Sequence, residues 1–567
     1  MVLVGSLLSA GSLARVYQVD DPLLRTIELL SLEAGINAFS SAGPVSGYEL
    51  ARHMEKINRS TLSSASKELY DQVHEVLHDP FHGNIWSISF DAAFEAYWHD
   101  NPSFQFYEWI EGYTDRKPFL NGEAETVFGS HGYGVFSYAF QDEFDELNFN
   151  GAATNNPFIL NGNGFAVQNS QPSTAFLGFS SEWGTLVAGR DAVHFGAGNT
   201  GNLMIGSHVP YHDFLQGSLS NSKFKYTFLA IPMNELITGA MLDNELTGGN
   251  LGEAWIPWKD SSGDGEIDTW HTLFHGALYR IYIAHRFEVD VFPRWRIALT
   301  EGTLFYVDTL DPRIFSPLAF NHNLQTFGEV NNSMGLETDL TLSPHWMLNV
   351  QVFLDQLQTS GEQNTEGKIP PNAGALLIGG RYRYSGDEWK VDGYVEGVYT
   401  SPFAYLRTGD HTDNYDSDTG TYDGYTYEET QYNLDFVHAV NMEDRVSGVN
   451  WLGYVYGPDS IVLAASLTAG RGPWKIHPSL RYIVQGERGL MIEGKIQQVE
   501  EQFAEDINMF SPSGDNPLHT LVAGFGVSRS IPEVNLTVYT RNYWVNRWDN
   551  SGYSADVQLM AGVSYSY

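Results

Sequence analysis

The chain has 567 residues, a formal net charge of -38 and no cysteine. The missing cysteine excludes disulfides, thiolate nucleophiles and Cys-ligated metal or iron–sulfur sites, and the negative charge opposes binding to nucleic acid. No stretch approaches the roughly 20 consecutive apolar residues that a transmembrane helix requires, which excludes a helical membrane protein.

Residues 1–14 have the character of a signal peptide. An apolar run extends from Val2 to Leu13, and Ser12-Leu13-Ala14 resembles a signal-peptidase site, although no Lys or Arg precedes it. We expect a truncated signal peptide over residues 1–14; an ordinary N-terminal segment is the alternative.

Residues 15–80 show helical spacing of their apolar residues. One apolar face contains Leu23, Leu24, Ile27 and Leu30, and a second contains Tyr48, Leu50, Ala51, Met54 and Ile57. Pro44 and Gly47 separate the two, and Pro80 ends a third helical segment. We therefore expect a small helical domain of three short helices over residues 15–80.

The last of these helical segments contains the sequence His74-Glu75-Val76-Leu77-His78, which matches the H-E-x-x-H zinc motif. Zinc needs a third ligand, and His82 lies beyond Pro80, off the helix. We therefore favour an exposed helix end over a zinc hydrolase, and we do not expect an enzyme.

From residue 81 to residue 567 the apolar period changes from helical spacing to two. In the final segment the apolar positions are Ala555, Val557, Leu559, Ala561, Val563, Tyr565 and Tyr567, and mostly polar residues lie between them. The same alternation recurs around Ile281, Trp346, Trp389 and Trp474. The connections between such segments alternate along the chain between tight turns and long acidic loops.

A soluble β-sandwich also alternates, but its inward face is apolar. Here the segments run to roughly ten residues, and aromatic residues lie near their ends, as in the interfacial girdle of a membrane barrel. The polar face carries charges that a sandwich core could not accept but a wet lumen can: Arg381, Arg383, Lys390, Asp392, Glu396, Arg481 and Asp556. We predict a closed antiparallel outer-membrane β-barrel of about 18 strands over residues 81–567, in the bacterial outer membrane.

Two further patterns resemble ligand motifs. Gly196, Gly198 and Gly201 form a G-x-G-x-x-G without a following helix, so a turn or constriction that needs positive φ is favoured over dinucleotide binding. The loop from Asp260 to Asp268 resembles the start of an EF-hand, but its twelfth position is His271 and not a bidentate Glu. It is a candidate Ca²⁺ site, with the ligands Asp260, Ser262, Asp264 and Asp268, and otherwise an acidic surface loop. We expect no other cofactor.

The stretch WGTLVAGRDAVHFGAGNTGNLMIGSHVPYHDFLQGSLSNSKFKYTFLA, from Trp183 to Ala230, resembles the G-R-x-x-x-x-x-G-x-G signature hairpin of the Wzi-type capsule assembly family. Four further segments agree: GPVSGYELARHMEKI after Ala42, AHRFEVDVFPRWRIALTEGTLFY from Ala284, PRIFSPLAFNHNLQ from Pro312 and NVQVFLDQLQ from Asn349. The resemblance spans the helical domain and about the first half of the barrel.

This resemblance implies a helical domain on the periplasmic side, a lumen occluded by infolded loops, and lectin-like binding of exported polysaccharide. Its signature would include Arg190, Asp191, Gly196, Gly198, Asn199, Asn202, Asp213, Glu301 and Pro317. We expect these residues to brace loops inside the lumen, with direct sugar binding as the sharper alternative. A buried Arg190 would need a carboxylate from Asp191, Asp213 or Glu301. Asp191 near His194 is also a candidate acid–base pair of a barrel hydrolase, but nothing marks a nucleophile.

Aromatic residues of the long loops could stack on sugar rings: Trp255, Trp258, Tyr415, Tyr422, Tyr425 and Tyr427. A chain at -38 should repel an acidic glycan unless Ca²⁺ bridges them. We therefore predict a non-enzymatic, monomeric outer-membrane protein that contacts lipid and binds or organises surface polysaccharide. A passive cation-selective diffusion channel is the alternative.

Overall fold

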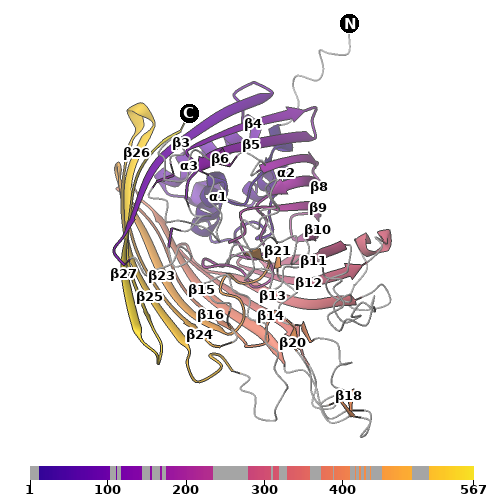
Figure 1. Cartoon of the computed structure of the whole chain (residues 1–567). Coiled ribbons are helices and arrows are strands. Elements are labelled where there is room, and N and C mark those ends of the chain that lie inside the picture. Colours follow the sequence, from indigo (N-terminus) through magenta and orange to yellow (C-terminus); the bar gives the residue numbers. More distant parts are fainter. Residues whose placement is uncertain are drawn as a thin grey trace.

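The computed structural model places most of the strands and helices of the chain (Figure 1). The residues that it describes are 12–101, 110–111, 116–142, 154–155, 167–168, 174–233, 279–307, 311–317, 329–357, 372–386, 388–405, 407–408, 415–416, 421–422, 427–428, 434–435, 450–487, 489 and 510–566. The expected signal peptide, residues 1–14, therefore lies almost wholly outside the described residues.

From residue 12 onward, three α-helices precede the barrel: α1 (Pro22–Glu33), α2 (Gly47–Met54) and α3 (Ser64–His78). Each begins at a side-chain cap, because Asp21, Ser46 and Ser63 accept hydrogen bonds from backbone N–H groups of the first turn. The helices share a buried apolar core that includes Ile27, Leu30, Leu50, Val73 and Leu77. The two-residue strands β1 (Val16–Tyr17) and β2 (Val45–Ser46) pair beside them. We call residues 15–80 the helical domain.

Eighteen long antiparallel strands close into one barrel in the described part of the chain, and the last strand pairs with the first. They are β3 (Trp86–His99), β4 (Leu120–Phe128), β5 (Gly132–Asp142), β7 (Thr174–Ser180), β8 (Gly184–Asp191), β9 (His212–Ser220), β10 (Phe224–Met233), β11 (Tyr279–Phe292), β12 (Trp295–Val307), β13 (Glu329–Ser343), β14 (Trp346–Gln356), β15 (Ala373–Ser385), β16 (Trp389–Thr400), β23 (Ser460–Arg471), β24 (Trp474–Gln485), β25 (Leu518–Ile531), β26 (Leu536–Trp548) and β27 (Tyr553–Ser566). The predicted closed barrel of about 18 strands is thus confirmed.

The described parts of the long connections contain seven two-residue strands. They are β6 (Val167–Gln168), β17 (Arg407–Thr408), β18 (Tyr415–Asp416), β19 (Thr421–Tyr422), β20 (Tyr427–Glu428), β21 (Leu434–Asp435) and β22 (Asn450–Trp451). β6 pairs with the end of β5, and the others form three small ribbons, β17–β20, β18–β19 and β21–β22.

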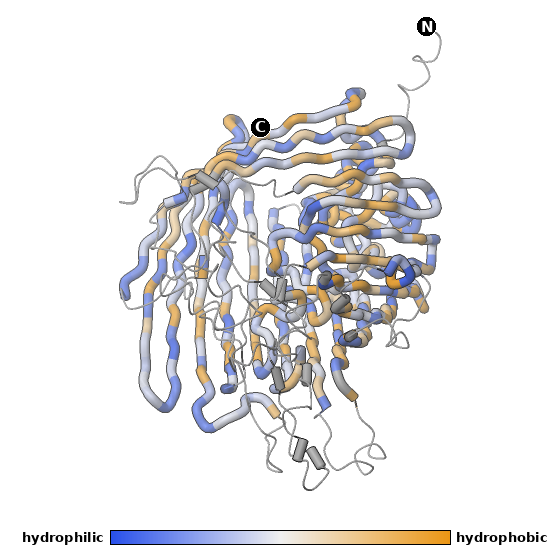
Figure 2. The backbone as a smooth tube through the Cα atoms, turned by 45° about the vertical axis from the view of Figure 1, so that its right-hand side comes forward, coloured by the Kyte–Doolittle hydropathy of each residue, from blue (hydrophilic) through white to orange (hydrophobic). Residues whose placement is uncertain are grey.

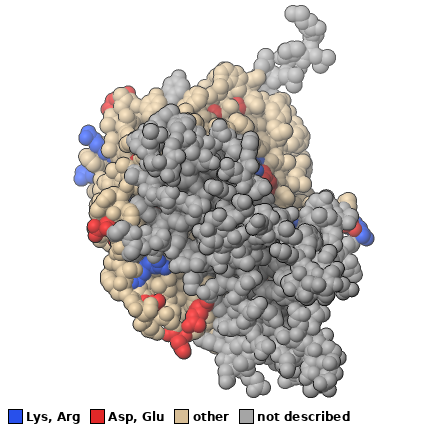
Figure 3. Space-filling model, in the orientation of Figure 1, with Lys and Arg blue, Asp and Glu red and all other residues tan. Residues whose placement is uncertain are grey.

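The outer face of the barrel is apolar. Hydrophobic and hydrophilic residues alternate along the strands (Figure 2), and the described surface in the space-filling view is mostly free of charged side chains (Figure 3). Large outward residues remain exposed, among them Val395 at 64% and Leu463 at 56%. A soluble protein would bury so many outward apolar side chains, whereas in a membrane protein lipid surrounds them.

Short turns join the strands at one end of the barrel, at residues 129–131, 181–183, 221–223, 293–294, 344–345, 472–473 and 532–535, and β15 is followed closely by β16 at the same end. Exposed aromatic residues gather close to this short-turn end: Trp86, Phe128, Phe179, Trp183, Phe224, Phe292, Trp346, Trp389 and Trp474. Such a ring of aromatic side chains marks the boundary between hydrocarbon and water. No described helix is long and apolar enough to cross a membrane.

A closed barrel with an apolar belt, an aromatic girdle and charged residues inside is the architecture of bacterial outer-membrane proteins. The protein is therefore embedded in the bacterial outer membrane through its strands. The three helices lie within the curve of the sheet (Figure 1), and their contacts, given below, are with the short-turn end.

Candidate functional site

The connection between β8 and β9, residues 192–211, turns into the lumen and is held there by side chains of distant strands. We call it the infolded loop. The carboxylate of Glu396 on β16 accepts hydrogen bonds from the backbone N–H groups of Asn199, at 2.8 Å, and Thr200, at 2.7 Å. The side-chain amide of Asn199 donates to the same carboxylate at 3.1 Å. One buried carboxylate thus satisfies consecutive N–H groups that have no strand partner.

Two further strands hold the infolded loop on either side of Asn199. On β13, Glu337 accepts a hydrogen bond from the N–H of Ala197 at 3.0 Å. On β14, the amide of Gln351 accepts from the N–H of Leu203 at 3.1 Å and donates to the buried side chain of Asn202 at 2.8 Å. Each anchor is a polar, inward-facing residue of the barrel wall, so the loop closely follows the wall from β13 to β16.

The glycines of the infolded loop are required by this packing. Gly196 has a φ of 128°, and a Cβ there would lie 2.3 Å from the Asn202 Oδ1 atom. A Cβ on Gly198 would lie 2.0 Å from the carbonyl oxygen of Gly201. Side chains at these positions would collide with the groups that hold the loop, which supports the turn interpretation of the G-x-G-x-x-G pattern over a dinucleotide site.

A buried ionic cluster joins the infolded loop to the helical domain. Arg286 on β11 forms ion pairs with Glu288, at 2.9 Å, and with Glu337, and all three side chains are nearly inaccessible to solvent. Ser40 donates to Glu288 at 2.8 Å and Arg286 donates to Ser41 at 2.7 Å. Because Glu337 also binds the infolded loop, this cluster connects three parts of the chain. Breaking one partner of such a buried pair would leave an uncompensated charge.

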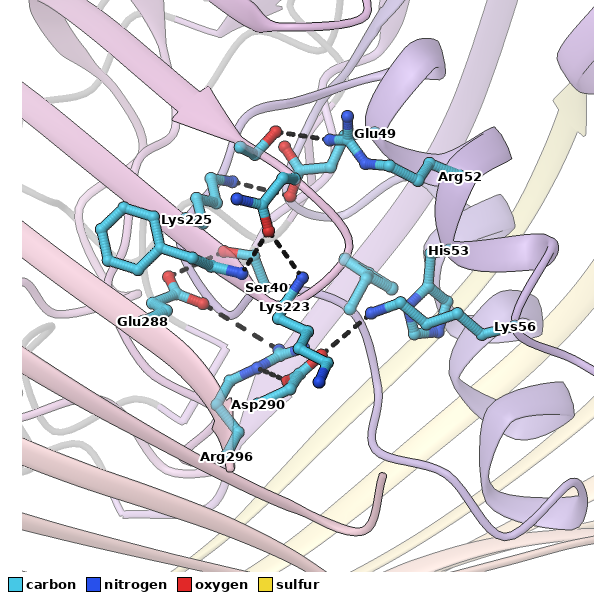
Figure 4. Close-up of a pocket in the computed structure, with 14 residues that line it drawn as sticks. Ser40, Glu49, Arg52, His53, Lys56, Lys223, Lys225, Glu288, Asp290 and Arg296 are labelled. Atoms are coloured by element: carbon cyan, nitrogen blue, oxygen red, sulfur yellow. Dashed lines mark hydrogen bonds and ion pairs between the residues drawn. The ribbon is translucent and has the colours of Figure 1, made fainter. Parts of the chain in front are cut away.

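A second set of ion pairs fixes helix α2 against the strands β10 to β12 (Figure 4). Lys225 pairs with Glu49 at 2.9 Å, and Lys56 pairs with Asp290 at 2.9 Å. Arg52 donates to the hydroxyl of Ser220 at the adjoining turn. The space left between these residues is about 40 Å³, enough for water but not for a small ligand. This surface is therefore a docking interface.

His53 of α2 lies at the edge of this docking interface, on the side of the helices, and is almost fully buried (Figure 4). Its Nε2 atom is 2.8 Å from the hydroxyl of Ser31 on α1. Burial lowers the pKa of His53 well below its usual value, and the positive charges of Lys56 and Arg296 lower it further. The imidazole is therefore neutral at neutral pH and acts as a link between α1 and α2.

The expectation that Arg190 and Asp213 brace a loop inside the lumen is wrong. The two residues pair across β8 and β9, with Arg190 Nε 2.9 Å and Nη2 2.7 Å from the carboxylate oxygens of Asp213. Their side chains share the outward face with Leu186 and Leu215, because alternate residues of a strand point to opposite faces. Asp213 does supply the expected carboxylate, but on the outside of the barrel, where it is 53% exposed.

Glu301 also differs from the expected position in the lumen. It lies opposite His285 between β11 and β12, on the face that alternates with the inward residues Arg296 and Thr300. Residues 311–317 cover this outer region, and the Tyr226 hydroxyl contacts both His285 and the carbonyl of Pro317. Glu301 and Pro317 are therefore close to each other, but outside the barrel wall.

Asp191 and His194 are both inside the barrel. Asp191 is buried at the end of β8 and accepts a hydrogen bond from the Thr174 hydroxyl at 3.3 Å. His194 belongs to the infolded loop and lines an internal cavity, and burial lowers its pKa. The described residues give Asp191 and His194 no mutual contact, so the acid–base pair stays a prediction without support.

The H-E-x-x-H motif lies on the last turns of α3, where the rings of His74 and His78 stack with centroids 4.2 Å apart. The described residues contain no group of three His, Asp or Glu side chains placed to hold a metal ion. The motif is found at an exposed helix end, where His78 also contacts the carbonyl oxygen of His74.

The loop residues expected to bind ligand are only partly described. Tyr415 and Tyr422 are register partners in the ribbon β18–β19, and Tyr427 pairs with Thr408 between β17 and β20. The remaining expected residues lie outside the described residues: Trp255, Trp258 and Tyr425 for glycan, and Asp260, Ser262, Asp264 and Asp268 for Ca²⁺.

Sequence reasoning did not assign anchoring roles to Glu337, Gln351 and Glu396. The alternation identified Glu396 as a lumen charge, and inward polar residues on neighbouring strands were the available signal. Their common partner could not be read from the sequence, because 197 residues separate Asn199 from Glu396.

A larger internal cavity of about 410 Å³ lies between α1 and the barrel wall. Its walls include Arg25 and Glu28 of α1, Arg381 and Arg383 of β15, and Thr468 and His477 of β23 and β24. Arg383 is buried and pairs with Asp392 at 3.1 Å and with Glu28. The helical domain thus meets one side of the lumen directly and leaves space on the other side.

A scan against protein-family models and a search of curated proteins give no match to this chain. Among solved structures, the chain is similar to Wzi of Escherichia coli, an outer membrane protein involved in group 1 capsule assembly and a carbohydrate-binding β-barrel. The match has a TM-score of 0.54 and 12% sequence identity, and covers 98% of this chain and 99% of that chain.

Weaker matches are the channel DcaP of Acinetobacter baumannii and OprD of Pseudomonas aeruginosa. Their TM-scores are 0.33 and 0.37 at 9% identity, over 85% of this chain and 97% and 95% of theirs. At these identities the similarity concerns the fold alone, and the weaker matches carry no argument about this chain. The protein is an outer-membrane β-barrel with the fold of Wzi.

Proposed function

We propose that the protein is a non-enzymatic outer-membrane protein that binds and organises surface polysaccharide through its long loops. The observation that carries this proposal is the infolded loop, which Glu337, Gln351 and Glu396 tie to the lumen wall. A barrel whose interior is occupied by a fixed loop and by a docked helical domain is poorly suited to free diffusion. Its long loops remain the part best placed to meet a ligand outside the cell.

The likeness to Wzi supports the same proposal, because that barrel is a carbohydrate-binding protein of capsule assembly. The sequence adds aromatic residues in the long loops, which suit stacking on sugar rings. A chain at -38 favours neutral glycans or a Ca²⁺-bridged acidic glycan at this surface.

The proposal is tested with the full-length protein in detergent and in planar bilayers. We expect retention of polysaccharide on a glycan array and only small, rare conductance steps in the bilayer. A steady cation-selective current without glycan retention would establish the diffusion channel instead.

Variants distinguish glycan binding by the aromatic residues of the long loops from glycan binding by those of the barrel surface. We expect the double substitution Trp255→Ala and Trp258→Ala to reduce glycan retention. The control Trp183→Ala removes an aromatic residue that is 73% exposed at the short-turn end, and should leave retention unchanged. Equal retention by all three proteins would contradict the assignment to these loop aromatics.

A further inference from the structure

The barrel wall formed by β23 to β26 contains a second cavity at the short-turn end, of about 240 Å³. It shares Thr468 and His477 with the 410 Å³ cavity beside α1, so the two spaces adjoin. Lys475 lies one residue from the start of β24, and Thr537 one residue from the start of β26, which places the cavity close to the turns 472–473 and 532–535. In outer-membrane barrels this end faces the periplasm.

The charge of this cavity is opposite to that of the chain. Its described lining contains three cations, Lys117, Lys475 and Arg541, and no carboxylate, whereas the chain as a whole carries -38. Arg541 is neutralised by Glu111, 2.9 Å away. Lys475 is exposed and forms no ion pair with the described residues. The Lys117 ammonium lies 4.6 Å from the ring centroid of Tyr539 and is exposed to the cavity.

Hydroxyl groups surround these cations. Ser528 on β25, and Thr537 and Tyr539 on β26, line the same space. The Tyr539 hydroxyl donates to the buried Glu95 at 2.7 Å, which fixes the ring on which the Lys117 ammonium lies. A rigid aromatic ring, hydroxyls that both donate and accept, and two ammonium groups that form no ion pair with the described residues are complementary to an acidic sugar. The ammonium groups suit its carboxylate, and the hydroxyls suit its ring oxygens.

The setting strengthens this attraction. A cleft lined by one sign of charge, with protein walls, concentrates counter-ions inside it. An acidic saccharide that the overall charge keeps from the rest of the surface would therefore gather here. The adjoining 410 Å³ cavity also contains carboxylates, of which Glu28 and Asp392 are paired with Arg381 and Arg383. Together the two cavities offer space of the order used by small-ligand sites.

We propose that the cavity between β23 and β26 binds an acidic saccharide from the periplasmic side. The ammonium groups of Lys475 and Lys117 would bind the carboxylate of that saccharide. This inference goes beyond the proposed function, because it concerns a cavity close to the short turns, to which the long connection between β3 and β4 contributes only Lys117. The acidic saccharide can be a segment of an exported polysaccharide or a cell-wall glycan, which share the carboxylated sugar chemistry.

The test measures binding of three probes to the detergent-solubilised full-length protein by calorimetry. They are trigalacturonate, its uncharged methyl ester, and a disaccharide-tetrapeptide of peptidoglycan. We expect an acidic probe to bind, with the methyl ester bound at least about tenfold more weakly, because an ammonium–carboxylate hydrogen bond is of that size. Added salt should weaken binding. Binding of trigalacturonate alone identifies an exported polysaccharide as the source, and binding of the peptidoglycan fragment alone identifies the cell wall.

Substitutions assign the site. Lys475→Gln and Lys117→Gln should each weaken the binding of the acidic probe about tenfold. Both side chains are exposed, so both variants should still fold. The matched control Lys390→Gln removes the same charge from β16, from a residue outside the lining of both cavities. Loss of binding in the control, unchanged binding in both lysine variants, equal binding of the acid and its ester, or no binding of either acidic probe would overturn the proposal. None of these outcomes depends on the glycan array of the long loops.

Discussion

Gly196 shows how a single residue can decide whether the infolded loop fits in the lumen. Its φ of 128° lies in a region that is open essentially to glycine, and its missing Cβ leaves space for the amides of Asn202 and Gln351. The same amides hold the loop to β14. The infolded loop can therefore be anchored to β14 only because residue 196 has no side chain.

We predict that Gly196→Ala lowers the free energy of unfolding by about 1–3 kcal/mol, the cost of a strained backbone conformation. It should also make residues 192–211 more sensitive to protease. Urea unfolding in detergent micelles and limited proteolysis measure the two effects. The control is Gly217→Ala on β9, where a Cβ would meet only Leu186 at 3.9 Å. Equal behaviour of the two variants would contradict the role of Gly196.

At the scale of elements, the helical domain has an apolar core of its own and is fixed in the barrel by charged and polar contacts. Lys225–Glu49 and Lys56–Asp290 lie on one side of α2, and the Arg286 cluster lies at residues 40–41. These contacts cost desolvation and give specificity of position more than net stability. The position of the domain should therefore respond to conditions that change charge.

We predict that acidification weakens the packing of α2 against α1 through His53, whose ring contacts Ser31 of α1. Its pKa is lowered in the folded state, so the unfolded state takes up a proton near pH 6.5 while the folded state stays neutral. The contribution to stability is complete above about pH 6.5 and falls as the pH decreases below it, by at most about 1.4 kcal/mol per pH unit.

Amide hydrogen exchange of α2 at pH 7.5 and pH 5.5, corrected for the intrinsic exchange rate, measures this effect. Protection should decrease at the lower pH in the natural sequence and much less in His53→Gln. His74→Gln, which changes a histidine at the exposed end of α3, serves as the control and should keep the full pH dependence. An unchanged dependence in His53→Gln would exclude His53 as the responsible group.

At the scale of the whole molecule, the barrel separates lipid, wall and lumen by strand alternation alone. Val395 of β16 faces outward, and Ser466 of the adjacent strand β23 faces the cavity beside α1. A side chain introduced at residue 395 should therefore lie in hydrocarbon, and the same side chain at residue 466 should lie in water.

We predict that Val395→Arg destabilises the barrel in lipid vesicles by about 2–4 kcal/mol, as expected for a charged residue in the middle of the lipid face. Ser466→Arg should cost far less, because the lumen is polar. Urea unfolding of both variants in vesicles gives the comparison. If Val395→Arg were as stable as Ser466→Arg, the outward face of β16 could not lie in lipid.

The sequence by itself determined the class of fold. A period of two over ten-residue segments, aromatic residues at the segment ends and charges on the polar face are local properties, and each strand carries them independently of its neighbours. The helical period before residue 81 and the caps at Asp21, Ser46 and Ser63 are local in the same sense.

Only the tertiary structure decided which side chains meet. Glu396 and Asn199 become neighbours because the barrel closes around a loop that the strand pattern does not describe. The family resemblance predicted that Arg190 and Glu301 lie in the lumen. In the structure, the register of β8 and β12 turns both side chains outward. A shift of one residue reverses the face of every side chain in a strand, so the position of a site residue depends on strand pairing, which single residues do not reveal.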